Sequence, residues 1–284
     1  MDSNRIADGA EQQPDRIRLL EQRAIADATH PLAQALTDAQ ATALTRWVRE
    51  TISTQIPAQL ADFIDWVRDL LRNAFHGKSR QAQADAERAA FTAAQQGVQH
   101  ASQLAAVMTG QPVPPIASEP GADAKAAADS IPAAIQAEHS HALALLTTAG
   151  LTATGLAGLN SVFKRARRAV GRIATAMAVA IGSAAAHGPL LVARALDARL
   201  LWVTEPGACP ACRAYAGLTV KPGHLFPGGL SLDPRRTVFT AAIPGPPRHP
   251  FCRCALVPWS PTWRLDGTPL SQLLRQRART NRRT

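Results

Sequence analysis

Cysteine and aromatic residues are scarce in this chain of 284 residues. Aromatic residues make up 5% of it, with a single tyrosine, and four residues are cysteines. This scarcity disfavours a sheet sandwich rich in Val, Tyr and Phe, and it disfavours a secreted protein stapled by many disulfides. The first residues, MDSNRIADGAEQQPDR, contain no apolar run typical of a signal peptide, so we expect synthesis and residence in a reducing cytoplasm.

Apolar residues nevertheless make up 46% of the chain, and alanine is the most frequent of them. A chain of this length can bury a sizeable core in one to three domains. Alanine favours helices, whereas the aromatic residues that favour strands are few. The composition therefore predicts tightly packed helices.

The first 110 residues contain three periodic runs that begin at prolines and a fourth that is rich in alanine. Apolar residues recur at steps of three and four, which places them on one face of a helix. Residues 1–13 are polar, and we expect them to be disordered. We expect helices that begin at Pro14, at Pro31 (ending near Thr54) and at Pro57 (ending at Gly77), and one long helix over 78–110.

Residues 111–130 are rich in Pro, Gly, Ser and Ala, which is typical of a linker. Helical sequence resumes over 131–200. Two stretches there, 141–163 and 174–193, carry no formal charge and are about long enough to span a membrane. Both consist mostly of Ala, Gly, Thr and Ser, which insert weakly. We therefore expect buried or oligomeric helices here, and no membrane partner.

Positive charge is concentrated after residue 110. The net charge is +10, and residues 1–110 carry 11 Lys or Arg against 13 Asp or Glu, whereas residues 111–284 carry 20 against 8. A basic collar, which consists of Lys164, Arg165, Arg167, Arg168 and Arg172, lies between the two uncharged stretches. A basic tail covers 260–284. Such clusters can contact DNA phosphates, although the collar could instead flank apolar helices and the tail could simply aid solubility. The candidate nucleic-acid-binding residues are Lys164, Arg165, Arg167, Arg168, Arg172, Arg275, Arg277, Arg279, Arg282 and Arg283.

All four cysteines lie in the segment 201–259. Cys209 and Cys212 form a C-x2-C pair, and after 36 residues His249, Cys252 and Cys254 form an H-x2-C-x-C cluster. Thiolates and imidazoles from two such pairs are the ligands of a structural tetrahedral zinc, which joins the two ends of a loop. The intervening segment is rich in glycine and proline and can bury little core of its own. The sequence therefore predicts a Zn²⁺ ion that holds this segment in shape.

Five candidate ligands exceed the four that a structural zinc takes. One choice is Cys209, Cys212, His249 and Cys252, which leaves Cys254 spare. The other uses all four thiolates and leaves His249 hydrogen-bonded behind them, and we favour it slightly because thiolates bind zinc strongly. An iron–sulfur cluster and a disulfide pair are less favoured.

These patterns together predict a mainly α fold, in which a helical N-terminal region precedes a small zinc-stabilised α+β C-terminal module. The expected domains are a helical domain (1–110), a linker (111–130), an Ala-rich helical region with the basic collar (131–200), the Cys/His zinc-binding module (201–259) and a basic tail (260–284).

The module also resembles a known family. Trp202, the C-x2-C pair, Gly217 and the run PPRHPFCRC follow one another in a specific order. In this order, residues 198–259 resemble the C-terminal module of the phage Mu F-like head morphogenesis proteins, which are minor capsid proteins of tailed phages. The resemblance covers about a fifth of the chain, and residues 1–200 show no motif of that family.

The resemblance implies a minor head protein that acts in head assembly. Its partners would be portal, capsid or scaffold proteins, with DNA as a further candidate, and it would reside in the virion and, during assembly, in the host cytoplasm. We expect no enzymatic reaction and no small-molecule substrate, because the acids nearest to the cysteines in sequence are Glu205 and Asp233 and no Gly-x-Ser-x-Gly element is present. Alternatives are a nuclease or protease built on the Cys/His module, or a zinc-dependent DNA-binding protein.

Overall fold

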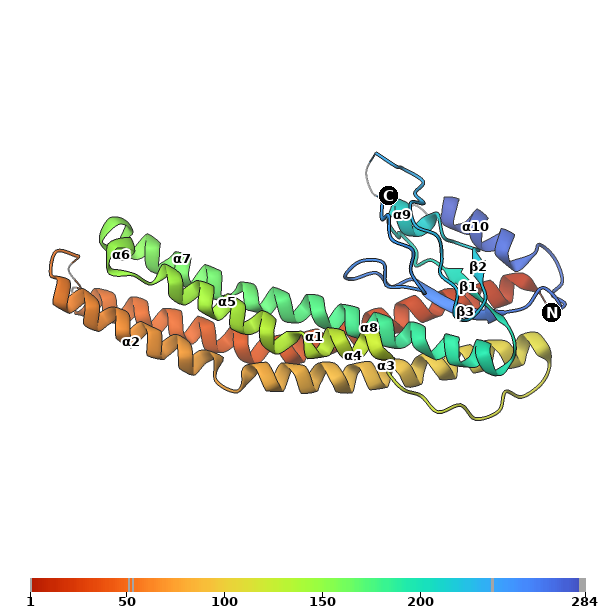
Figure 1. Cartoon of the computed structure of the whole chain (residues 1–284), viewed down its shortest axis with the longest axis horizontal. Coiled ribbons are helices and arrows are strands. Elements are labelled where there is room, and N and C mark those ends of the chain that lie inside the picture. Colours follow the sequence, from red (N-terminus) through yellow and green to blue (C-terminus); the bar gives the residue numbers. More distant parts are fainter. Residues whose placement is uncertain (1, 51, 53, 236–237, 281–284) are drawn as a thin grey trace. The chain divides into compact units, whose positions relative to one another are not determined.

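The structure is a computed structural model that describes residues 2–50, 52, 54–235 and 238–280 (Figure 1). It is 66% helical and contains a small three-stranded sheet, which confirms the mainly α fold. The chain forms two compact units. Unit 1 comprises residues 1–23, 87–127 and 177–284, and unit 2 comprises 24–86 and 128–176. This division does not follow the order of the expected domains, because each unit collects segments that are far apart in the sequence.

Unit 2 is made of helices. It contains α2 (Pro57–Phe75), α5 (Ile131–Leu145), α6 (Thr148–Thr154) and α7 (Leu156–Ala166), together with parts of α1 (Ser3–Arg49), α3 (Lys78–Thr109) and α8 (Arg168–Ala195). Helix α1 meets α2 where the ring of Trp47 stands edge-on to Phe63, with ring centroids 5.2 Å apart. Helix α2 meets α5 where Phe75 lies against His139. The observed α2 and α3 agree with the helices expected from Pro57 and over 78–110.

Unit 1 is built around the sheet. Strand β1 (Arg199–Val203) lies between β2 (Thr219–Val220) and β3 (Ala255–Trp259), and both pairings are antiparallel. Alternate residues of a strand point to opposite faces. Leu201 and Val203 therefore join a core with the first turns of α1, the end of α3 and α10 (Leu270–Thr280), while Leu200 and Trp202 join a second core with the cysteines.

The N-terminal part of α1 differs from the expectation. Residues 1–13 were expected to be disordered, but the helix begins at Ser3 and continues through Pro14 and Pro31 to Arg49. Its first residues are ordered by distant contacts, because Ile6 is buried in the core beneath the sheet and the amide of Ser3 donates to the carbonyl of Asp266 over 3.1 Å. Burial of this apolar face offsets the backbone donors that the two prolines remove.

The segment expected to be a linker is only partly irregular. Residues 112–121 contain no helix, and α4 (Ala122–Asp129) follows them. The side chains of Val113 and Ile116 pack against a core formed by α3 and α8 within unit 1. The first half of this segment is therefore an irregular chain that packs against unit 1.

The helical stretch Leu156–Ala195 contains a window whose mean hydropathy of 1.6 would allow it to cross a membrane by length and composition alone. In the structure it is divided between α7 and α8, and 61% of its most apolar window is buried within the protein. Buried core helices of soluble proteins have the same composition, so this stretch is a weak indication of a membrane span.

Candidate metal centre

An extended segment of the chain directs the two cysteines of the H-x2-C-x-C cluster toward the same side. Cys252, Cys254 and Leu256 are spaced two residues apart, so their side chains point to the same side and enter the core that contains Trp202. Arg253 points to the opposite side, where it meets Glu21 of α1. The alternation that builds the sheet thus delivers two thiols to one place.

The C-x2-C pair lies on a tight turn after β1. Gly207 has a φ of +76°, which glycine adopts without strain, and α9 (Pro210–Arg213) begins directly after Cys209. The backbone N–H of Cys212 donates to the sulfur of Cys209 over 3.4 Å. This bond orients the Cys209 sulfur toward Cys212.

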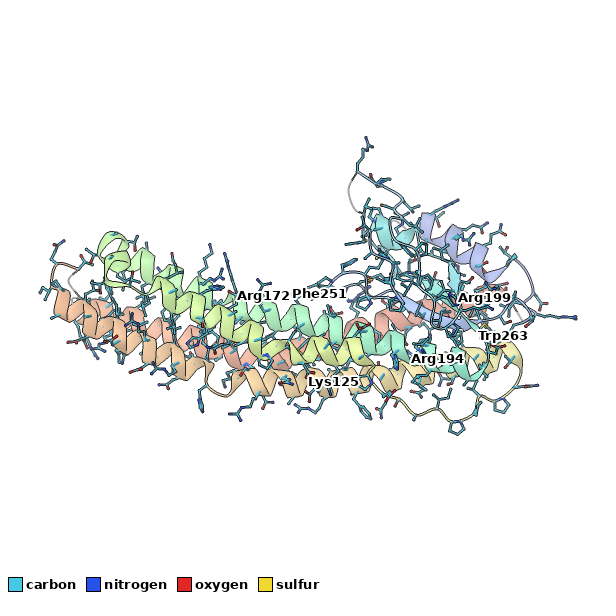
Figure 2. The ribbon with its side chains drawn as sticks, viewed as in Figure 1. Lys125, Arg172, Arg194, Arg199, Phe251 and Trp263 are labelled. Carbon is cyan, nitrogen blue, oxygen red and sulfur yellow. The ribbon has the colours of Figure 1, made fainter. Side chains whose placement is uncertain are left out.

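His249 begins a β-turn that ends at Cys252, whose N–H donates to the carbonyl of His249 over 3.1 Å. Pro250 precedes Phe251, which has a φ of +62° at a turn position that usually requires glycine. Phe251 lies on the loop before β3 (Figure 2). Nδ1 of His249 lies 2.8 Å from the carbonyl of Pro250. Because a carbonyl only accepts, Nδ1 carries a proton, so Nε2 is the nitrogen directed at the cysteines, and it can offer its lone pair to a metal when the imidazole is neutral.

The five ligand atoms form two overlapping groups of three. Cys209, Cys212 and His249 form one group, Cys212, Cys252 and Cys254 form the other, and the atoms within each group lie within 4.8 Å of one another. Nε2 of His249 is 3.5 Å from the sulfur of Cys209 and 3.4 Å from that of Cys212. The sulfurs of Cys212 and Cys252 are 3.7 Å apart. The predicted cluster is therefore close enough to hold a metal ion, and Cys212 belongs to both groups.

The electrostatics of these side chains favour a mixture of charges. Hydrogen bonding from Cys212, assisted by His249, lowers the pKa of Cys209 to about 4, and the bond with Cys209 raises the pKa of His249 to about 9. The pKa of the Cys212 thiol is raised because it hydrogen-bonds with the sulfurs of Cys209, Cys252 and Cys254, and these bonds favour its protonated form. Several thiolates at these distances repel one another, so a bound dication would stabilise the fully deprotonated set.

The acids near the cluster are engaged by arginines. Arg18 of α1 donates to Glu205 over 2.9 Å, and the guanidinium of Arg253 donates to the buried carboxylate of Glu21 over 2.8 Å. The backbone N–H of Arg253 also donates to Glu205 over 3.4 Å. The ion pair of Glu205 with Arg18 thus connects α1 to the turn that carries the C-x2-C pair within unit 1. Because its carboxylate is engaged in this way, Glu205 is not free to act as a general base.

An aromatic layer supports the centre. The ring of Trp202 is fully buried and packs against Tyr215 and Phe226, with ring centroids 5.1 and 5.0 Å away. The guanidinium of Arg248, next to His249, lies 4.5 Å above the ring of Tyr215, and Phe239 stacks on His249. These neighbours fix the direction from which the imidazole enters the cluster.

Gly217 allows the close approach of another element. Its φ is +70°, and a Cβ at this position would lie 2.0 Å from the carbonyl oxygen of Ser271 in α10. Its backbone N–H donates to the carbonyl of Trp202 over 2.9 Å. Gly217 and Trp202, on which the family resemblance rests in part, are therefore both integral to the module.

The candidate nucleic-acid-binding residues have different environments. Arg165 and Arg172 pair with the buried carboxylate of Glu138, each over 3.0 Å. In the tail, Arg277 pairs with Asp8 and Glu11 of α1. Arg275 donates to a backbone carbonyl, Arg282 and Arg283 lie outside the described residues, and no ion pair within the described part of the chain involves Lys164, Arg167, Arg168 or Arg279.

Sequence reasoning did not identify Glu21, Arg18, Arg248 or Phe239 as parts of this centre. The first two come from a segment that was expected to be a separate domain, so no local pattern links them to the cysteines. Arg248 directly precedes His249, and its position next to a ligand is the signal that could have drawn attention to it.

Comparison with known proteins identifies no relative of this chain: no family model matches it, and neither does any curated protein or any solved structure.

Proposed function

We propose that this protein is a minor head protein of a tailed phage that acts in head assembly, with a zinc ion holding its C-terminal module. The observation that carries the proposal is the pair of overlapping ligand groups, Cys209, Cys212 and His249 in one and Cys212, Cys252 and Cys254 in the other, which share the thiol of Cys212. The same module contains Trp202 and Gly217, so the residues on which the resemblance rests serve one local structure. A role in assembly requires such a rigid module to present a surface to portal, capsid or scaffold proteins.

The donor set and its dimensions support zinc. A tetrahedron with Zn–S bonds of about 2.3 Å and Zn–N bonds of about 2.0 Å has sulfur–sulfur edges of about 3.8 Å and sulfur–nitrogen edges of about 3.5 Å. The contacts of Cys212 with Cys252 (3.7 Å) and of His249 with Cys209 (3.5 Å) have these lengths. Thiolates combined with imidazole also suit zinc better than they suit magnesium or calcium.

Among the ligand choices, Cys209, Cys212, His249 and Cys252 have the better support. Nε2 of His249 is directed at two of the thiols, with its tautomer fixed by Pro250. Cys252 and Cys254 both belong to the second group of three. The sulfur of Cys252 lies 3.7 Å from that of Cys212, and Cys252 follows His249 at the spacing at which Cys212 follows Cys209, whereas Cys254 is buried next to the backbone of Glu205. We therefore prefer this set to the four thiolates that the sequence slightly favours.

A structural role is favoured over a catalytic one. Four protein ligands would complete the coordination of zinc, whereas catalytic zinc keeps a position open for water. Glu205, the candidate general base nearest in sequence, is held by Arg18 and Arg253. Within the part of the chain that the structure describes, no observation therefore favours the nuclease and protease alternatives.

The assembly role can be tested by the protein composition of phage particles. We expect the protein in purified proheads or mature heads of the phage that encodes it, at a fixed ratio to the portal protein, by quantitative mass spectrometry. Its absence from both particles, in lysates that contain the protein, would contradict the assembly role while leaving the zinc assignment intact.

A further inference from the structure

An open groove in unit 2 is lined by the residues of the basic collar that face α5. Its volume is about 570 Å³, and its lining comes from the end of α5, the end of α7 and the start of α8. The charged and polar lining residues are His141, Ser161, Lys164, Arg165 and Arg168, and the remaining ones are Ala144 and Leu145. Collar and groove thus combine a concave surface with several hydrogen-bond donors.

The groove has an excess of positive charge that its own acid does not cancel. Glu138 is the last acidic residue before Asp197. Among the 58 residues between them, every formally charged residue is a Lys or an Arg. The buried carboxylate of Glu138 is shared by Arg165 and Arg172, the latter labelled on α8 in Figure 2. One carboxylate cannot balance the five cations of the collar, so this face attracts anions.

Donors dominate the lining. Arg165 donates to Nδ1 of His141, because a guanidinium has no acceptor, and Nε2 of a neutral His141 therefore carries the ring proton. The ammonium of Lys164 and the guanidinium of Arg168 are exposed, and no ion pair among the described residues engages them. Ammonium, guanidinium and imidazole N–H donors form the set that binds phosphate oxygens.

We propose that this groove binds the phosphodiester backbone of duplex DNA. No Phe, Tyr or Trp is among the residues that line it, so it lacks the broad stacking platform by which proteins hold the bases of single strands. Lysine and arginine in an otherwise small-residue groove instead suit sequence-independent contact with backbone phosphates. The inference deepens the proposed function by giving a site to the contact with DNA that the uneven charge of the sequence suggests, and it rests on that function only in this respect.

The salt dependence of binding provides the test. Each phosphate contact on B-DNA contributes about −0.9 to the slope of log K against log salt concentration. We expect the double variant Lys164→Gln/Arg168→Gln to bind a 20-base-pair duplex with a slope that is shallower by about 2, and about tenfold more weakly per lost contact at ~50 mM salt. Fluorescence anisotropy with a labelled duplex measures both quantities. Both side chains are exposed, and Arg165 is left in place because it pairs with buried Glu138.

A matched control removes the same charge elsewhere. The variant Arg80→Gln/Lys125→Gln replaces two exposed cations that do not line the groove, and it should keep the slope of the unsubstituted protein. An equal loss of slope in both variants would show a diffuse effect of net charge and would overturn the proposal.

Two competitors identify the ligand class. We expect unlabelled duplex to displace the probe more effectively than a single strand of equal length or a poly-glutamate peptide of equal charge. More effective displacement by the peptide would make the groove a protein-docking surface, and preferential binding of the single strand would overturn the duplex assignment. The zinc content of the double variant should equal that of the unsubstituted protein, so a failure here is distinguishable from a failure of the metal-held module.

Discussion

At the scale of single residues, the module depends on polar side chains whose directions are fixed by neighbours. The carbonyl of Pro250 fixes the tautomer of His249, Phe239 stacks on its ring, and Arg253 is held by Glu21. A ligand fixed in this way loses less conformational entropy when it binds a metal. The candidate ligands are therefore oriented by residues outside the ligand set.

His100 provides a prediction about acid stability. It is buried on α3 in unit 1, and desolvation, together with the charge of Arg16, lowers its pKa to about 4. In the unfolded chain a histidine titrates near 6.5, so between these two pH values the unfolded state binds the proton more readily than the folded state does. Neutral His100 thus contributes stability that is complete above about pH 6.5 and is lost as the pH falls toward about 4.

The variant His100→Gln should lose this pH dependence. Between pH 7 and pH 4, the free energy of unfolding of the unsubstituted protein should fall by up to about 3 kcal/mol more than that of the variant. Urea unfolding followed by circular dichroism at several pH values gives both curves. Parallel curves would contradict the assignment of a buried neutral imidazole.

At the scale of elements, α3 and α8 cross with their backbones in close contact inside unit 1. A Cβ at Gly97 would lie 2.5 Å from the carbonyl oxygen of Ala185, and one at Gly188 would lie 2.4 Å from the amide nitrogen of Val98. Pro189 lies four residues after Ala185 and has no N–H, so that carbonyl has no helical donor and is available to the approaching helix. A weak Cα–H donor at Gly97 suits this position.

Gly97→Ala should therefore destabilise the protein, by about 1–3 kcal/mol, because the helices must move apart. Gly171→Ala is the matched control. It lies in the same helix as Gly188, and a Cβ there would meet nothing within 4 Å, so it should stabilise the protein by about 0.5–1 kcal/mol through helix propensity. Thermal unfolding of both variants checks the pair. Equal shifts in the same direction would contradict the proposed crossing.

The elements also show how far sequence predicts this fold. The periodic run after Pro57 and the C-x2-C and H-x2-C-x-C spacings are local features, and they predicted a helix and a cluster of metal ligands. Pro14 is a local breaker too, yet α1 passes through it because Ile6 and its neighbours are buried against the sheet. Such contacts join residues more than 200 positions apart, and no pattern within a window of one helix reports them.

At the scale of the whole chain, the first residues belong to the same compact unit as the cysteines. Residues 1–23 cover the face of the sheet formed by Leu201, Val203 and Val257, and they supply the partners of Arg253 and Glu205. The module expected over 201–259 is thus part of a larger unit. We therefore expect its stability to depend on α1 as well as on the proposed metal.

Deletion of residues 1–23 should therefore prevent folding of unit 1, although every candidate ligand remains. The sheet face would be exposed and the ion pairs with Arg18 and Glu21 would be lost; removing one partner of a buried ion pair alone costs about 3–5 kcal/mol. Limited proteolysis with mass spectrometry should show cleavage within 199–259 in the truncated chain and protection in the full chain. Protection of that segment in both would show that the module folds independently.

The central claim is that one metal ion holds the Cys/His module, and the zinc-to-protein ratio tests it most directly. Elemental analysis of protein purified under reducing conditions, without chelators, should give about one zinc per chain for the unsubstituted protein and for Cys254→Ser. Cys212→Ser, which removes the thiol shared by both groups of ligands, should give less than about a tenth of that. A ratio below about a tenth in the unsubstituted protein, or an unchanged ratio in Cys212→Ser, would contradict the account.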